Sequence, residues 1–337
     1  MFKQLSLITL VGLLILSITA AQAQSAVDPA LVETTIQAFD QTRASTSLHI
    51  DMQRLIRIEG TAFGGNQQSS ASWDVVQTAA GWNLSGSQTS LFSLGDMTNE
   101  STIRYIVVDG VTYLNLDDMQ FNGAVMQGNP PQGTPADQPA GAMPFDGEIP
   151  EGWFTLEADS ADQPLPMLGA TDNLVQQAFG ALLFPISGDS ISSISEIAGD
   201  TIDGQAMRVL QITLDSQAVI DSEANTLLSA GGGLIREFAG GMPPQMGENT
   251  PQSAPPADAQ PPEPDTARDA MLDAANIRVV FAVYIGQDDA LVHRIYSVIE
   301  IAGSGQNENP ISSTITTIYD FSAFNAPVEI VAPAVSS

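Results

Sequence analysis

The 337-residue chain contains no cysteine, one lysine, two histidines and few aromatic residues. Without cysteine there is no disulfide, zinc finger, iron–sulfur cluster or thiol catalysis, so packing must stabilise the fold. Nine arginines stand against 39 acidic residues. Nucleic acids and anionic membrane surfaces repel such a chain, and we expect neither as a partner. The acidity is typical of a soluble, aggregation-resistant surface; a cation-binding surface is the alternative, and no EF-hand loop supports it.

Sequence signatures of catalysis and metal binding are absent as well. The G-x-S-x-G elbow, the H-E-x-x-H motif and the Walker A loop do not occur. His49 lies on the polar face of a predicted strand and His293 lies beside Arg294; without a third ligand they form no metal site, and we expect structural roles for both. We therefore predict no catalytic residue, no metal, no cofactor and no enzymatic activity.

A pair of carboxylates, as in glycosidases, is a catalytic arrangement that the sequence leaves open. It requires only two acids at a suitable separation, and a chain with 39 acids gives no basis for choosing them. Asp117–Asp118 and Asp288–Asp289 follow predicted strands, where Asp side chains cap turns, and we interpret both pairs as turn residues.

The first 23 residues have the pattern of a cleavable export signal. Lys3 gives the positive start, residues 5–18 are apolar, and Ala21-Gln22-Ala23 fits the small-x-small cleavage rule. We predict that the mature chain begins at Gln24 and is secreted or periplasmic. Because there is no cysteine to carry a lipid, we expect no stable membrane anchor after cleavage.

One amphipathic helix and many strands are predicted for the mature chain. Asp28-Pro29 is typical of a helix start, and apolar residues at helical spacing continue to about Arg43. From Leu48 to Glu59 apolar and polar residues alternate, as in a half-buried strand. Asp-Gly at 109–110 and at 203–204 indicates tight hairpins. Further strands are expected at 72–78, 82–91, 102–108, 111–116, 190–197, 206–214, 277–285, 291–301 and 311–321.

Proline divides these patterns unevenly. Fourteen of the 21 prolines fall in two segments, which we place at about 121–150 and 241–266 and expect to be flexible insertions. Strand patterns resume with the same character after each segment. We therefore predict a single domain of the α+β class over 24–337 rather than two domains.

Two further helical patterns, at 173–184 and 216–238, are strongly apolar. A helix that is apolar around most of its circumference packs within a core or faces a hydrophobic ligand. Over a curved sheet, two such helices would cover an apolar space suited to an acyl chain, since each buried methylene contributes about 0.8 kcal/mol. The predicted lining residues of this space are Val175, Phe179, Leu182, Leu183, Leu227, Leu228, Leu234 and Phe238.

Three motifs give the chain a resemblance to a known family. They are Val-Val-Asp-Gly-Val-Thr-Tyr at 107–113, Asp-Asp-Ala-Leu-Val-His-Arg at 288–294, and Tyr-Asp-Phe at 319–321 followed by Pro-Val-Glu-Ile-Val-Ala-Pro at 327–333. With these motifs the chain resembles the LppX/LprG group of envelope lipoproteins, which belongs with the LolA-like lipoprotein carriers.

The resemblance spans residues from about 28 to 333. It implies a curved antiparallel sheet, the LolA-like half-barrel, with helices covering the concave face around an apolar cavity for lipids. It supplies no catalytic residue. The chain departs from the anchored members in lacking the lipobox cysteine.

Three functions remain open from the sequence. The leading hypothesis is an exported, soluble protein that binds or carries a lipid or another acyl-chain ligand. The alternative is a non-enzymatic envelope sensor or scaffold that binds a protein partner through a sheet edge or its loops. An acidic hydrolase is the third, and it requires two buried carboxylates with shifted pKa values in a cleft.

Overall fold

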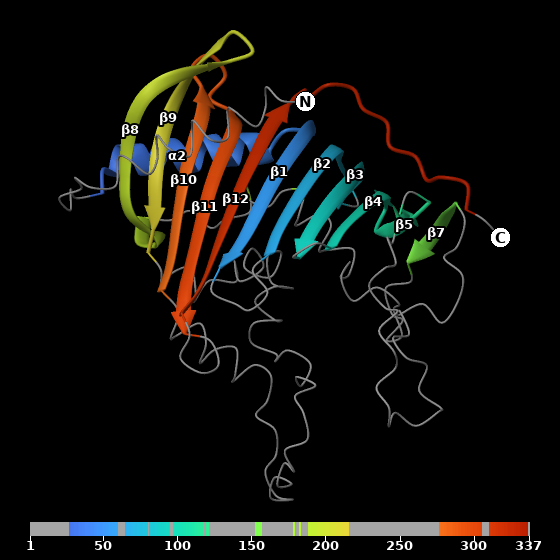
Figure 1. Cartoon of the computed structure of the whole chain (residues 1–337). Coiled ribbons are helices and arrows are strands. Elements are labelled where there is room, and N and C mark those ends of the chain that lie inside the picture. The colour runs from blue at the N-terminus through green and yellow to red at the C-terminus, as the bar shows by residue number, and fades with distance from the viewer. Residues whose placement is uncertain are drawn as a thin grey trace, which may run out of the picture.

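The computed structural model describes residues 27–59, 65–79, 81–94, 97–117, 119–120, 152–156, 178, 182, 188–215, 276–304 and 310–335. Their strands form one large, curved antiparallel sheet, and a helix lies against its concave face (Figure 1). The predicted fold class is confirmed. The predicted signal at 1–23 and the insertions at 121–150 and 241–266 lie outside the described residues, so the single-domain assignment stays a prediction.

The described elements are one helix of several turns, one short 3₁₀ helix and twelve strands. The helices are α2 (Pro29–Arg43) and η2 (Gly188–Ser190). The strands are β1 (Ser47–Glu59), β2 (Gly65–Thr78), β3 (Gly81–Leu94), β4 (Met97–Val108), β5 (Val111–Asn115), β6 (Met119–Gln120), β7 (Trp153–Leu156), β8 (Ile191–Ile202), β9 (Gln205–Leu214), β10 (Asn276–Gly286), β11 (Val292–Ser304) and β12 (Pro310–Ser322).

The sheet consists of two meanders that meet at its centre. Its strand order is β7-β5-β4-β3-β2-β1-β12-β11-β10-β9-β8, with β6 paired to β4 beside this path. β1 pairs with both β2 and β12, so the first and last long strands of the chain are neighbours. β7 and β8 end the path on either side, which leaves the sheet open rather than closed into a barrel.

Helix α2 begins and ends where the sequence predicts. Asp28 is the N-cap, and its Oδ1 accepts a hydrogen bond of 2.9 Å from the backbone N–H of Ala30. Pro29 occupies the first helical position, where its missing N–H needs no partner. In Figure 1 the helix crosses behind strands β8 to β12.

The two predicted Asp-Gly hairpins are also confirmed. Asp109 and Gly110 have φ values of 50° and 82°, and Asp203 and Gly204 have 50° and 86°. Positive φ at both central residues is the requirement of the turn that matches strand twist, and glycine meets it without strain. These turns join β4 to β5 and β8 to β9.

Several strands are longer than their sequence patterns indicate. β2 begins at Gly65, although its apolar alternation is clear only from residue 72. The sequence pattern predicts no strand at 153–156, where the structure has β7. Residues 65–71 are mostly Gln, Ser and Asn, which give a weak strand signal. Pairing with β1 on one side and β3 on the other holds them extended despite that composition.

The register of the strands assigns their residues to two faces, because directly paired residues point to the same side. Ile50 of β1 lies opposite Phe321 of β12 and Trp73 of β2, and all three belong to one core cluster with Phe39 of α2. We call this side the inner face. The intervening residues of β1, beginning with His49, form the outer face.

Candidate functional site

The inner face next to α2 is a densely packed core. Phe39, Ile50, Trp73 and Phe321 are each 2% exposed or less. Burial of such large apolar side chains stabilises the fold strongly, since truncating one of them costs about 3–5 kcal/mol. These residues fix the helix against the sheet.

Trp73 is held in place from two sides within this core. Its Nε1 donates a hydrogen bond to the Tyr105 hydroxyl, and burial raises the pKa of that hydroxyl. Gly86 on β3 lies opposite Trp73, and a Cβ at Gly86 would overlap the indole ring and the Ser72 carbonyl. Glycine at this position therefore makes room for the indole on the inner face.

The C-terminal end of α2 is fastened to the beginning of β11. The Val292 backbone N–H donates a buried hydrogen bond of 2.8 Å to the Thr42 hydroxyl. A strand advances about 3.3 Å per residue, so Ile299 lies about 23 Å further along β11. The inner face therefore extends well past this end of the helix.

The inner face has a second apolar region, which lies away from the C-terminal end of α2. Its members share β-branched side chains, occupy four neighbouring strands and are buried or partly buried within the main core cluster. We call it the isoleucine patch, and it consists of Ile56, Ile58, Ile277, Ile299, Ile301 and Ile315. Four of these isoleucines are buried, and the one polar side chain that register places among them is Ser313, between Ile58 and Ile301.

A row of polar residues crosses the inner face between these two apolar regions. Cross-strand register places Arg54 of β1 next to Thr317 of β12 and Ser69 of β2. Beyond Thr317 the row reaches a serine of β11, and beyond Ser69 it reaches a serine of β3 and then a serine of β4. We call it the Arg54 row, and its members are Ser297, Thr317, Arg54, Ser69, Ser90 and Ser101.

Alternation along β1 contains the signal for Arg54, which the sequence-based list of site residues does not include. Leu48, Ile50 and Met52 precede it on the inner face and Ile56 follows, so Arg54 occupies an inward position in an apolar series. Its Nη2 donates to the Tyr319 hydroxyl at 3.3 Å, and Tyr319 is itself an inner-face residue. The hydroxyl neighbours of Arg54 depend on strand register and could not be predicted from β1 alone.

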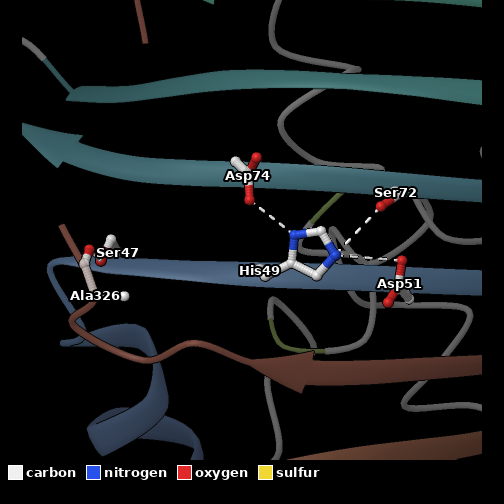
Figure 2. Close-up of polar contacts among 6 residues, drawn as sticks. All are labelled: Ser47, His49, Asp51, Ser72, Asp74 and Ala326. Carbon is white, nitrogen blue, oxygen red and sulfur yellow. Dashed lines mark hydrogen bonds and ion pairs between the residues drawn. The ribbon is translucent and has the colours of Figure 1, made fainter. Parts of the chain in front are cut away.

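The outer face carries a polar cluster around His49 (Figure 2). His49 Nδ1 lies 2.7 Å from Asp74 Oδ1, and its Nε2 lies 3.2 Å from Ser72 Oγ and 3.4 Å from Asp51 Oδ1. The imidazole is 30% exposed. The sequence predicts a solvated structural histidine, and the structure gives it specific partners on two adjacent strands.

The side-chain contacts run from Asp74 to His49 and from His49 to Ser72, as they do from the acid to the base and from the base to the nucleophile in serine hydrolases. Two features argue against that role. Asp51 competes for the same Nε2, and both β1 and β2 are paired on each side, so their N–H groups there serve the sheet rather than an oxyanion. We interpret the cluster as a cross-strand contact.

The described residues do not contain the carboxylate pair that the hydrolase hypothesis needs. No Asp or Glu among them is buried. Burial alone would raise the pKa of Asp289, but hydrogen bonds from the Leu291 N–H and His293 outweigh it, so this pKa lies below its ordinary value. A general acid requires the opposite shift. Asp289 lies in a turn, as predicted.

The described part of the chain holds neither a metal-ligand cluster nor a helix that could span a membrane. Its His, Asp and Glu residues form no group of three or more that could hold a metal ion. None of its helices combines the length and the apolar composition that crossing a bilayer requires.

Of the eight predicted lining residues, the structure describes one. Leu182 is fully buried and belongs to the same core cluster as the inner face. The others lie outside the described residues, and their role stays a prediction: Val175, Phe179, Leu183, Leu227, Leu228, Leu234 and Phe238.

No protein-family model and no curated protein sequence matches the chain. Among solved structures it is similar to LprF from Mycobacterium bovis, with 12% identity and a TM-score of 0.41 over 92% of this chain and all of that one. It is similar to the Mycobacterium tuberculosis lipoprotein LppX, with 13% identity and a TM-score of 0.37 over 90% of this chain and all of that one. A DUF1329 family protein from Desulfovibrio piger matches at 9% identity and a TM-score of 0.21, over 89% of this chain and 94% of that one. LprF and LppX are of the group that the sequence resembles.

Proposed function

We propose that this protein binds a lipid or another acyl-chain molecule on the inner face of its sheet and carries it outside the cytoplasm. The isoleucine patch is the observation that supports this most. It extends the apolar inner face past the end of α2 that is fastened to β11. An alkyl chain needs no polar partner, and each methylene removed from water contributes about 0.8 kcal/mol to binding.

The apolar segments 173–184 and 216–238 have a part in this proposal as the cover of the ligand. Leu182 lies in the core cluster of the inner face, which supports a place for the first segment on that side of the sheet. The eight lining residues from Val175 to Phe238 would then face the ligand, and the sheet would hold its other side.

The missing lipobox cysteine suggests a carrier that diffuses instead of remaining tethered. Protein recovered from the envelope or medium should begin at Gln24 when its N-terminus is sequenced, since the Ala21-Gln22-Ala23 site precedes that residue. Recovery of chains that still carry residues 1–23 from the cytoplasm alone would contradict export.

Native mass spectrometry of the full chain, purified from its own envelope or medium, tests the carrier function. We expect a mass above that of the bare chain that returns to the bare mass after organic extraction. Delipidated protein should then bind a fluorescent acyl probe. A bare mass before extraction, together with no uptake of the probe, would overturn the proposal.

Two neighbouring residues of β11 offer a matched pair of variants. Ile301 belongs to the isoleucine patch and is partly exposed, whereas Ala302 is exposed on the outer face. Ile301→Asn should weaken probe binding at least tenfold, because it places an amide on the hydrocarbon surface. Ala302→Asn should leave binding unchanged. Equal effects of the two variants would count against the inner face as the binding surface.

A protein-binding sensor or scaffold remains the second candidate, and the edge of the sheet favours it. β8 ends the strand path, and its residues 198–201 are exposed. An exposed edge can pair with a strand of another protein. A stable protein partner in a pull-down that is lost on Thr201→Pro, from a chain without bound lipid, would support this candidate over the carrier.

A further inference from the structure

The two strands that end the strand path, β7 and β8, differ greatly as edges. β7 has four residues, and such short edge strands protect a sheet against pairing with other chains. β8 has twelve residues and contains neither proline nor lysine, which are further means of protection. No described strand lies beside β8 on the side away from β9. β8 is therefore the edge of the described sheet that best accommodates a further strand.

Residues 193–197 form the longest regular run of this edge. They pair one to one with residues 209–213 of β9, whereas the register shifts both before and after the run. Bulges disturb the ladder and the twist of an edge strand, so they limit where another strand can be added. An added strand therefore has the five residues of this run to pair with.

Glu196 is the charged residue of the regular run. Its side chain is 48% exposed, and its Oε2 accepts a hydrogen bond of 2.8 Å from Arg208 Nη2 of β9. Register places Glu196 opposite Leu210, so Arg208 is a diagonal neighbour on β9. An added strand would supply the neighbours on the other side of Glu196, and cross-strand pairs of opposite charge are stabilising. A basic residue of that strand would give Glu196 a cation on each side.

The remaining charges of β8 and its flanking turns have the same sign. Residues 188–204 contain Asp189, Glu196, Asp200 and Asp203 and no Lys or Arg. Like charges on neighbouring strands are destabilising, so an acidic strand would be disfavoured at this edge. The net charge of −29 also attracts a basic partner over a longer range. Charge thus selects a basic strand at β8.

We propose that the open edge of β8 binds an extended strand of a partner protein, with a Lys or Arg of that strand beside Glu196. This inference rests on the second candidate function, the protein-binding one, and specifies the chemistry of its partner. In this mode of recognition backbone hydrogen bonds supply affinity and neighbouring side chains supply selectivity. The inner face has no part in it, so strand binding and lipid binding can be tested separately.

Calorimetric titration of the full chain with three synthetic peptides tests the inference. Two are heptapeptides of alternating threonine and valine whose central residue is lysine or glutamate. The third is the lysine peptide with methylated backbone nitrogens at the lysine and both its neighbours, which blocks pairing along either edge of the peptide. The lysine peptide should bind about three- to tenfold more tightly than the glutamate peptide. The methylated peptide should not bind measurably, because it cannot form the ladder.

Two glutamates in similar ion pairs offer matched variants. Glu196→Gln removes a charge from the edge strand and should abolish the preference for the lysine peptide. Glu300→Gln removes an equal charge from the interior strand β11, where Glu300 bonds Arg278 at 3.2 Å, and should leave the preference intact. Both variants have the same net charge, so the general attraction of a basic peptide to an acidic chain is matched.

The outcomes separate this inference from both candidate functions. Equal binding of the lysine and glutamate peptides by the wild-type chain would overturn the charge assignment and leave strand binding in place. Binding of the methylated peptide, or a preference that survives in Glu196→Gln, would show that the peptide is not held as a strand beside Glu196. Failure of all three peptides to bind would overturn the inference and remove the edge as support for the protein-binding function. The carrier function stands or falls on the acyl probe alone, and the wild-type comparison decides the matter even where Glu196→Gln fails to fold.

Discussion

The two faces of β1 place charge in different ways. On the outer face His49 and Asp51 alternate with inward residues and meet partners such as Asp74 at the surface. On the inner face Leu48, Ile50 and Met52 are at most 3% exposed, and Arg54 follows them in the same series. An exposed ion is stabilised by water, whereas an inward arginine needs protein or ligand groups for that purpose.

This difference separates structural contacts from functional candidates. The outer cluster has a His, two Asp and a Ser in contact, yet solvent screens its charges and paired strands surround it. The Arg54 row has fewer of the residue types found in catalytic sites than the His49 cluster has. It lies, however, between two apolar regions on the inner face of the sheet. Position on the sheet therefore tells more about function here than the list of side chains does.

Truncation of Trp73 should show the largest effect of any change considered. Trp73→Ala removes a side chain that is 1% exposed and packs on the inner face, so the free energy of unfolding should fall by about 3–5 kcal/mol. Gln53→Ala on the exposed outer face of β1 should change it by less than about 0.5 kcal/mol. Urea unfolding, followed by far-UV circular dichroism of the backbone, measures the free energy of unfolding of both variants. Similar losses for the two variants would break the distinction between the faces.

Removal of the Thr42 hydroxyl should have the next largest effect. Thr42→Val keeps the shape of the side chain but leaves the buried Val292 N–H without its acceptor, a loss of about 1–3 kcal/mol. Thr34, whose hydroxyl bonds the Ala30 carbonyl on the exposed side of α2, is the control. Thermal unfolding of Thr42→Val and Thr34→Val should differ clearly. If they match, the bond between helix and sheet adds nothing to stability.

Alkaline pH should destabilise the protein through its buried tyrosines. Burial raises the pKa of Tyr105 on the inner face, so the folded chain keeps a proton that the unfolded chain loses above pH of about 10. The stabilisation is fully present below that pH and falls by about 1.4 kcal/mol per pH unit above it. Urea unfolding from pH 8 to 11 should show a shallower decline for Tyr105→Phe than for the wild type.

Two tyrosines of the outer face should preserve part of the loss of stability at alkaline pH in the Tyr105→Phe variant. Burial also raises the pKa of Tyr284 and of Tyr296, so Tyr105→Phe should retain part of the pH dependence. A variant as steep as the wild type would show that the inner hydroxyl is not protected from titration.

Loss of His49 should have the smallest effect. His49→Ala removes a partly exposed imidazole with carboxylate neighbours on the outer face, and contacts of this kind contribute about 0.2–1 kcal/mol. Thermal unfolding at neutral pH measures the change. A loss as large as that of Trp73→Ala would show that the outer cluster is a structural centre rather than a surface contact.

Local patterns predicted much of this fold. The N-cap at Asp28, the alternation of β1 and the two Asp-Gly turns involve residues close in sequence, and all appear where expected. The start of β2 at Gly65 and the whole of β7 were missed, because their local composition is a weak strand signal that sheet pairing overrides.

The candidate site was predicted only in part. Apolar positions of the isoleucine patch follow from strand alternation, and the inward place of Arg54 follows from the same period. The sequence does not predict the hydroxyl neighbours of Arg54, because Thr317 is 263 positions away and Ser69 belongs to a strand with a weak apolar pattern. Strand register brings them together.

The sequence by itself determined the class of the fold, because period-two alternation and turn chemistry are local properties of the chain. It also determined that Arg54 breaks an apolar series. Only the tertiary structure decided which strands are neighbours, and with that which face α2 covers and which residues form one row across the sheet. Backbone hydrogen bonds between distant strands fix that register, and no local pattern encodes the partner of a strand.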